Sequence, residues 1–95
     1  MSIRIGPHQF ENVDYDAEHD ILYAWTGAAQ ATTGEPMEDD GTSTFNYTVA
    51  GKLVGVDLFD ARRRLERGGT LVITLPNGQK VEAEGVEAVV GQPAA

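Results

Sequence analysis

Apolar and polar residues alternate in the second half of the chain in the manner of β-strands. In residues 43–49 the large apolar side chains fall at every second position, which predicts a strand with Phe45, Tyr47 and Val49 facing inward. A short Ala-Gly-Lys turn leads from there into the apolar residues 53–59. Two strands joined by so short a turn form an antiparallel hairpin.

A second hairpin is predicted further along the chain. Residues 70–75 are a run of branched side chains, and the Pro-Asn-Gly sequence that follows is a turn signal. Residues 79–84 then return with Val81 and Ala83 facing inward and the charged side chains between them facing outward.

One helix is predicted between the two hairpins, at about residues 60–67. Asp60 is the expected N-cap, because its carboxylate can accept bonds from the amides at the start of the helix. Gly68 and Gly69 end the helix, and Leu65 packs inward. Residues 86–90 fit either a last strand or a short helix.

The first half of the chain is predicted to hold a shorter pair of strands. Residues 21–26 are rich in aromatic and β-branched side chains, and residues 10–15 are the expected partner strand. Residues 27–41 combine glycine, proline and acidic residues, which predicts a long loop. The expected fold is therefore α+β, a mostly antiparallel sheet of five to six strands with one short helix.

Length and composition limit the class of protein. The 95 residues form a single domain, 1–95, and they include no cysteine, which removes disulfides and thiolate metal sites. The chain contains no apolar run of about 18 residues and begins without a signal-peptide pattern. We therefore expect a soluble, cytoplasmic protein that does not enter a membrane.

Negative charge is concentrated in the N-terminal half. The formal net charge is −8, and residues 1–48 carry nine acidic side chains against Arg4 alone. Such a field repels phosphate backbones and attracts basic partners, so nucleic acid is not an expected ligand. Residues 62–67 carry four arginines. We interpret them as a solvated helix face that is balanced by Asp60 and Glu66.

Two stretches resemble a known family. Residues 15–23, YDAEHDILY, resemble a Y-D-x-x-x-D-x-L-Y opening, and residues 51–61, GKLVGVDLFDA, resemble a G-x-L-V-G-[IV]-[ED]-[IL]-L-[DG]-A core. In this order they are similar to the small prokaryotic family called domain of unknown function 2283. The resemblance covers about residues 13–65, and the hairpin at about 70–84 lies outside it.

The resemblance implies structural roles and no activity. It implies that Asp16 and Asp20 bracket a turn, that Gly55 permits a close backbone approach, and that Asp60 caps the helix. It supplies neither catalytic residues nor a cofactor. Similar proteins are sometimes encoded beside small toxin-like proteins, which implies a neutralising partner as one role for this chain.

The carboxylates in and around the first turn are the candidate metal ligands. Hard oxygen ligands fall at every second position, a spacing that calcium loops use, although the glycine and the distal glutamate of an EF-hand are missing. The alternative is an acidic turn between two strands. The candidates are Asp14, Asp16, Glu18 and Asp20.

Other polar and aromatic residues offer further candidates. Asp57 interrupts an apolar strand, where a carboxylate is either a catalytic acid with a raised pKa, a residue of the wetter face, or the partner of a helix arginine. His8 and His19 have no second ligand or nucleophile nearby in the sequence, so both are expected on the surface. Trp25 ends its strand beside the loop, which favours a place at an interface.

These observations favour a non-enzymatic protein-interaction module. We expect it to form a homodimer or larger homo-oligomer through sheet edges or through the C-terminal hairpin, because a sheet built of sequential hairpins leaves at least one edge strand without a partner. One alternative is an acidic neutralising partner of a small basic, toxin-like protein. A second alternative is a carboxylate-based metal or enzyme site at Asp14, Asp16, Asp20 and Asp57.

Overall fold

The computed structural model describes residues 2–27, 33–36 and 43–91 of the chain. Nine strands and two helices lie within these ranges, and the α+β class is confirmed. Their bounds are β1 Ile3–Ile5, β2 His8–Phe10, β3 Asn12–Asp16, β4 Ile21–Trp25, β5 Thr33–Pro36, β6 Ser43–Tyr47, β7 Leu53–Phe59, α1 Ala61–Gly68, β8 Val72–Thr74, β9 Lys80–Glu84 and α2 Val86–Val90.

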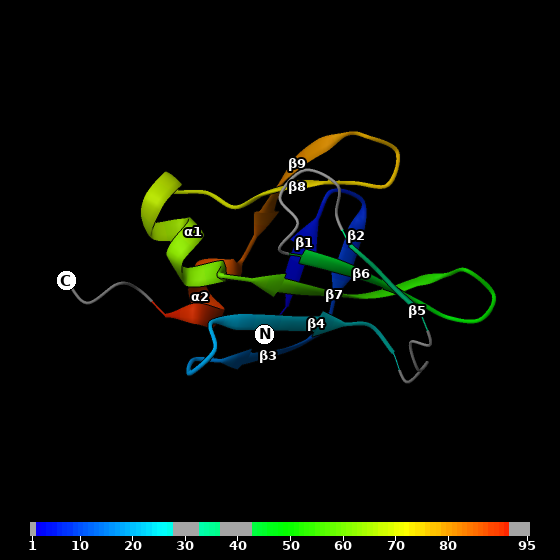
Figure 1. Ribbon diagram of the computed structural model, residues 1–95, viewed down its shortest axis with the longest axis horizontal. Helices are drawn as coiled ribbons and strands as arrows, with labels where there is room; N and C mark the ends of the chain where they lie inside the picture. The colour runs from blue at the N-terminus through cyan, green and yellow to red at the C-terminus, as the bar shows by residue number, and fades with distance from the viewer. Residues whose placement is uncertain (1, 28–32, 37–42, 92–95) are drawn as a thin grey trace.

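The strands form two antiparallel sheets, which corrects the prediction of a single sheet with five to six strands. One sheet has the strand order β3-β4-β7-β6-β5 and the other the order β2-β1-β9-β8. The second sheet joins the two ends of the described chain, because β1 pairs with β9. Figure 1 shows α1 and α2 beside each other at one end of the molecule.

The five-stranded sheet comes from the middle of the chain. It contains the predicted hairpin of β6 and β7 and the predicted pair of β3 and β4. Alternate side chains of its strands are buried on one inner face: Leu22, Ala24, Ser43, Phe45, Val56 and Leu58. Val49 is 88% exposed, contrary to the prediction, because β6 ends at Tyr47 and Val49 lies in the turn beyond it.

The sequence predicted one of the two hairpins in the four-stranded sheet. The hairpin of β8 and β9 is confirmed, with Ala83 buried, Val81 half-buried and the charged side chains between them exposed. The hairpin of β1 and β2 was missed. Each of its strands has three residues, which is too short for a periodic pattern to be recognised.

Part of the predicted loop at residues 27–41 is a strand. Residues 33–36 form β5 and pair with β6 at the edge of the five-stranded sheet. The sequence Thr-Gly-Glu-Pro has the composition of a loop, so this strand depends on the backbone bonds that β6 offers it. The remaining loop residues, apart from Gly27, lie outside the described part of the chain, as do residues 92–95.

The structure confirms the predicted helix at about residues 60–67 and shows that residues 86–90, predicted as a strand or a helix, are a helix. α1 covers the predicted range and ends at Gly68. Gly69 follows as the C-cap, and its left-handed backbone lets its amide bond to the carbonyl of Leu65. Residues 86–90 are helical, with Val86 and Val90 buried. No helix in the described ranges is long and apolar enough to cross a membrane.

A single core unites both sheets and both helices. Its fifteen buried hydrophobic residues include Ile3, Leu22, Val56, Ile73 and Val86, which come from five different elements. Leu65 packs against this cluster from α1, as predicted. Both sheets therefore pack on one shared core.

Candidate functional site

The turn between β3 and β4 is held by its own polar side chains. The Asp16 carboxylate accepts hydrogen bonds from the backbone amides of Glu18 at 3.1 Å and His19 at 3.2 Å. Its other oxygen lies 2.8 Å from Nδ1 of His19. The His19 side chain is the main cause that lowers the pKa of Asp16. Asp16 therefore stabilises the turn.

Asp20 caps helix α1 from a distant part of the chain. Its Oδ1 accepts a bond from the amide of Arg62 at 2.8 Å, and its Oδ2 accepts one from the amide of Arg63 at 3.1 Å. The Tyr15 hydroxyl donates a third bond to Asp20 at 2.8 Å. These amides have no partner within the helix, so Asp20 performs the role that the sequence assigned to Asp60.

Asp60 occupies the N-cap position without a capping bond from its side chain, which corrects the prediction. Its φ is 56°, in the left-handed region, whereas a residue that caps its own helix is extended. The Asp60 side chain instead lies 3.9 Å from the guanidinium of Arg63.

The contacts of Asp20 shift two pKa values. Burial alone would raise the pKa of Asp20, but the amide of Arg62 and the hydroxyl of Tyr15 outweigh it, and the pKa is lowered. Burial and the bond to Asp20 raise the pKa of Tyr15 to about 12. Asp20 is therefore ionised and Tyr15 protonated at neutral pH, the states in which their hydrogen bonds form.

The four candidate metal ligands do not converge. Asp16 and Asp20 serve the turn and the helix, while Asp14 and Glu18 are exposed. Across the residues that the structure describes, no group of three or more His, Cys, Asp or Glu side chains is placed to hold a metal ion.

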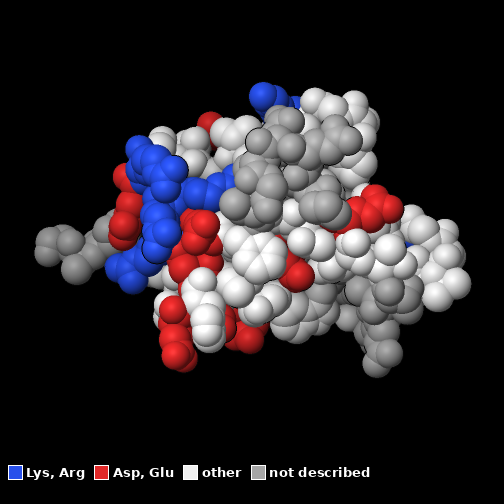
Figure 2. Space-filling view, in the orientation of Figure 1, with Lys and Arg blue, Asp and Glu red and all other residues white. Residues whose placement is uncertain are grey.

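The arginines of α1 form a ridge that is only partly solvated, because Arg63 and Arg67 are exposed whereas Arg62 and Arg64 are half-buried. Figure 2 shows basic side chains gathered over α1 and acidic side chains beside them. Arg62 pairs with Glu66 at 3.3 Å, and Arg64 donates to the hydroxyl of Ser43 and the carbonyl of Val72. These contacts tie the ridge to its own helix and to both sheets.

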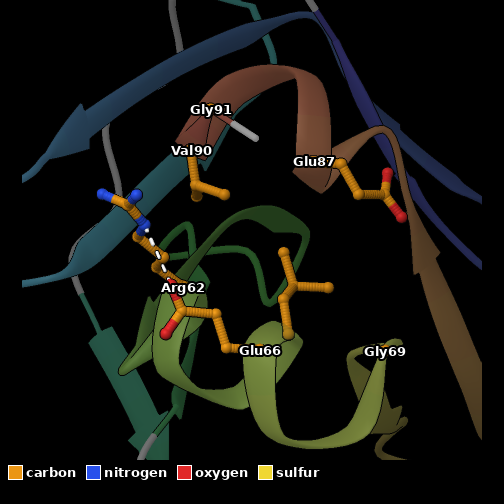
Figure 3. Close-up of a pocket in the computed structure, with 7 residues that line it drawn as sticks. Arg62, Glu66, Gly69, Glu87, Val90 and Gly91 are labelled. Atoms are coloured by element: carbon orange, nitrogen blue, oxygen red, sulfur yellow. Dashed lines mark ion pairs between the residues drawn. The ribbon is translucent and has the colours of Figure 1, made fainter. Parts of the chain in front are cut away.

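A small cavity lies between α1 and α2 (Figure 3). Its volume is about 170 Å³, and Leu65, Glu66, Val90 and Arg62 are among the residues that line it. The Nε of Arg62 is buried there, with the Glu66 carboxylate as its ionic neighbour. Ligand pockets usually measure about 300–1,000 Å³, so this space is smaller than a site for a metabolite.

Asp57 lies on the outer face of the five-stranded sheet, the face turned away from the core. It stands between Tyr23 of β4 and Thr44 of β6, and it accepts a bond from Nδ2 of Asn46 at 3.1 Å. Burial raises the pKa of Asp57. Its hydrogen-bond partner among the described residues is thus an amide and not an arginine of the helix.

Trp25 lies on the same outer face and is 40% exposed. It stands opposite Gly55 of β7, where an added Cβ would come within 2.9 Å of the carbonyl oxygen of Ala24 and 3.4 Å of Cβ of Trp25. Gly55 thus permits the close approach that the resemblance implied. His8 stacks on Phe10 with ring centroids 6.4 Å apart, and His19 is exposed.

An open groove of about 530 Å³ lies at the free edge of β3. Residues 11–15 line it one after another, together with Trp25 from the outer face and Val89 from α2. β3 is the last strand in its sheet, so one side of its backbone has no partner strand among the described residues. Sequence reasoning expected a free edge but did not locate this one, because the position of a strand in the sheet order is a tertiary property.

Comparison with known proteins does not assign this chain to a family or a function. The chain matches no family model, no curated protein and no solved structure. The resemblance to domain of unknown function 2283 therefore stays a prediction.

Proposed function

We propose that this chain is a non-enzymatic protein-interaction module and that it binds an extended segment of a partner at the free edge of β3. The groove at this edge carries the proposal. It follows five consecutive backbone positions, 11–15, and its volume of about 530 Å³ suits a peptide better than the small cavity between the helices does. An extended segment that pairs with a sheet edge gains main-chain hydrogen bonds along its length.

The roles of the carboxylates support binding over catalysis. Asp16 holds a turn, Asp20 caps a helix, and Asp57 bonds to Asn46. Each of the three carboxylates thus has a hydrogen-bonding role in holding the fold. Trp25 adds a large, partly exposed ring beside the groove, and tryptophan is enriched where proteins bind one another.

The test selects peptides that bind the protein from a random library and then measures their binding to a variant whose β3 edge cannot pair with another strand. Along an antiparallel edge strand, the amides of successive residues point alternately toward the neighbouring strand and outward. Of the two variants Val13→Pro and Asp14→Pro, one therefore removes a bond to β4, and the other leaves the bonds to β4 in place and removes an outward donor together with the side chain at that position. Circular dichroism identifies the folded variant.

We expect peptides selected on the unchanged protein to compete with one another and to bind the folded proline variant at least about tenfold more weakly, a loss of about 1.4 kcal/mol. Full binding to that variant would show that the β3 edge is not the site.

Self-association is the second candidate function. It is favoured by Val72, which is 45% exposed on β8, the outermost strand of the four-stranded sheet. An exposed apolar side chain on the outermost strand of a sheet can take part in pairing with another chain. Light scattering at rising concentration measures this directly, and a monomer mass at the highest concentration would contradict it.

A further inference from the structure

We infer that the segment bound at the β3 edge is basic, with arginine or lysine at alternate positions of an extended chain. This inference rests on the proposed function and adds the chemistry of the partner. It is carried by the charge of the groove, the register of β3 and the position of Trp25.

The groove presents carboxylates without a counter-charge. Glu11 and Asp14 line it and are exposed, and neither has an ion pair or side-chain hydrogen bond among the described residues. Neither lysine nor arginine is among the residues that line the groove. The chain as a whole carries a net charge of −8, which attracts a basic segment at long range.

The same charges oppose a second copy of the chain at this edge. An antiparallel pair of β3 strands centred on Asp14 would place that carboxylate directly opposite its own copy. Cβ atoms of directly opposed residues lie about 4.5–5.5 Å apart, and like charges at that distance are destabilising. A basic segment in the same position would replace this repulsion with attraction.

The register of β3 sets the spacing of the partner's basic residues. The residues of β3 that face outward are Asn12, Asp14 and Asp16, while Val13 and Tyr15 pack against the core. A strand added at the edge presents every second side chain to the same face. A basic residue opposite Asp14 forms an ion pair with it.

Trp25 provides a second contact on that face. Its cross-strand neighbour in β3 is Asn12, whose side chain is short. An arginine opposite Asn12 extends over this side chain toward the exposed indole, and a guanidinium above a tryptophan ring is a favourable cation–π arrangement. Arginine at both positions is therefore the preferred ligand chemistry.

The experiment uses three synthetic peptides with blocked ends. The first alternates arginine and threonine, the second alternates glutamate and threonine, and the third has the charge of the first but proline at every threonine position. Calorimetry gives the affinities, and the fluorescence of Trp25, the single tryptophan, reports binding beside the groove. We expect only the arginine–threonine peptide to bind well, because proline lacks the amide that strand pairing needs.

Two neutralising variants separate the edge from the overall charge. Asp14→Asn removes a charge in the groove, and Glu82→Gln removes one from the exposed face of β9 in the other sheet. We expect Asp14→Asn to weaken binding of the arginine–threonine peptide by about 1.5-fold to fivefold, the range for an exposed ion pair, and Glu82→Gln to leave it nearly unchanged. An equal effect of the two variants would overturn the inference.

The outcomes distinguish this inference from the proposed function. Apolar or acidic peptides that bind the unchanged protein and fail on the folded proline variant would refute the basic partner and keep the β3 edge as the site. An arginine–threonine peptide that binds the folded proline variant unchanged would refute both. If the unchanged protein forms a dimer and the folded proline variant is a monomer, the β3 edge binds a second copy of the chain, and the inference of a basic partner is overturned.

Discussion

Asp20 connects two parts of the chain that are far apart in the sequence. Its carboxylate accepts bonds from the amides of Arg62 and Arg63 and from the hydroxyl of Tyr15. A single side chain thus fixes the start of α1 against the turn between β3 and β4. Loss of a helix cap costs about 0.5–2 kcal/mol in other proteins, which is a large part of the stability of a small domain.

We predict that Asp20→Asn lowers the free energy of unfolding by about 1 kcal/mol, because the amide group accepts with one oxygen where the carboxylate accepts with two. Urea denaturation at neutral pH measures the change. Asp60→Asn is the matched control: Asp60 has nearly the same φ, 56° against 55°, but makes no capping bond through its side chain. Equal losses in the two variants would contradict the assignment of Asp20 as the cap.

The same prediction has a pH dependence. The pKa of Asp20 is lower in the folded state than in the unfolded chain, so its stabilisation is present above about pH 4 and is lost as the pH falls through the folded value. The difference between the unchanged protein and Asp20→Asn therefore shrinks on acidification. A difference that stays constant between neutral pH and about pH 2 would show that the charge of Asp20 has no part in the cap.

At the scale of elements, the contact between β4 and β7 depends on a residue without a side chain. Gly55 stands opposite Trp25, and an added Cβ would lie 2.9 Å from the carbonyl oxygen of Ala24. A backbone atom at that distance cannot move aside without disturbing the pairing of the two strands. This contact sets how closely the central strand of the sheet approaches its neighbour.

We predict that Gly55→Ala destabilises the protein by about 1–3 kcal/mol through this overlap. Gly68→Ala is the control, because a Cβ there meets nothing within 4 Å and alanine is the better helix former. Thermal unfolding should show a lower Tm for the first variant and an unchanged or higher Tm for the second. A Gly55→Ala variant as stable as the unchanged protein would mean that β4 and β7 separate without cost.

At the scale of the whole molecule, both ends of the described chain complete the core. Nine of its fifteen buried residues lie outside residues 13–65, the stretch that carries the family resemblance. Six of them come from residues 71–90. We therefore expect the four-stranded sheet to belong to the same folding unit as the five-stranded sheet.

We therefore predict that a chain ended at Gly69 does not fold cooperatively. It would lack β8, β9 and α2, so β1 would keep β2 as its only partner strand among the described residues, and the core would lose six of its fifteen buried residues. Circular dichroism during heating measures the cooperativity. A sharp thermal transition in the shortened chain would show that the first 69 residues form a domain of their own.

The sequence alone determined the elements whose pattern is local. Alternation in residues 43–59, the turn signal after Leu75 and the glycines after Arg67 each act over a few neighbouring residues, and the structure confirms the hairpins and the helix they predict. β1, β2 and β5 escaped prediction because three or four residues carry too little periodicity. Their strands form because another strand offers backbone partners.

Only the tertiary structure decided which distant groups meet. Two contacts join residues that are far apart in the chain: the pairing of β1 with β9 and the cap that Asp20 places on α1. The position of β3 at the edge of its sheet likewise depends on the order of all five strands. These arrangements form because together they bury a shared core. The hydrophobic effect has no preferred direction, so the sequence does not show which distant strand or helix a given apolar residue will pack against. For this protein the candidate binding edge is consequently a property of sheet order, while its acidic charge was visible in the sequence.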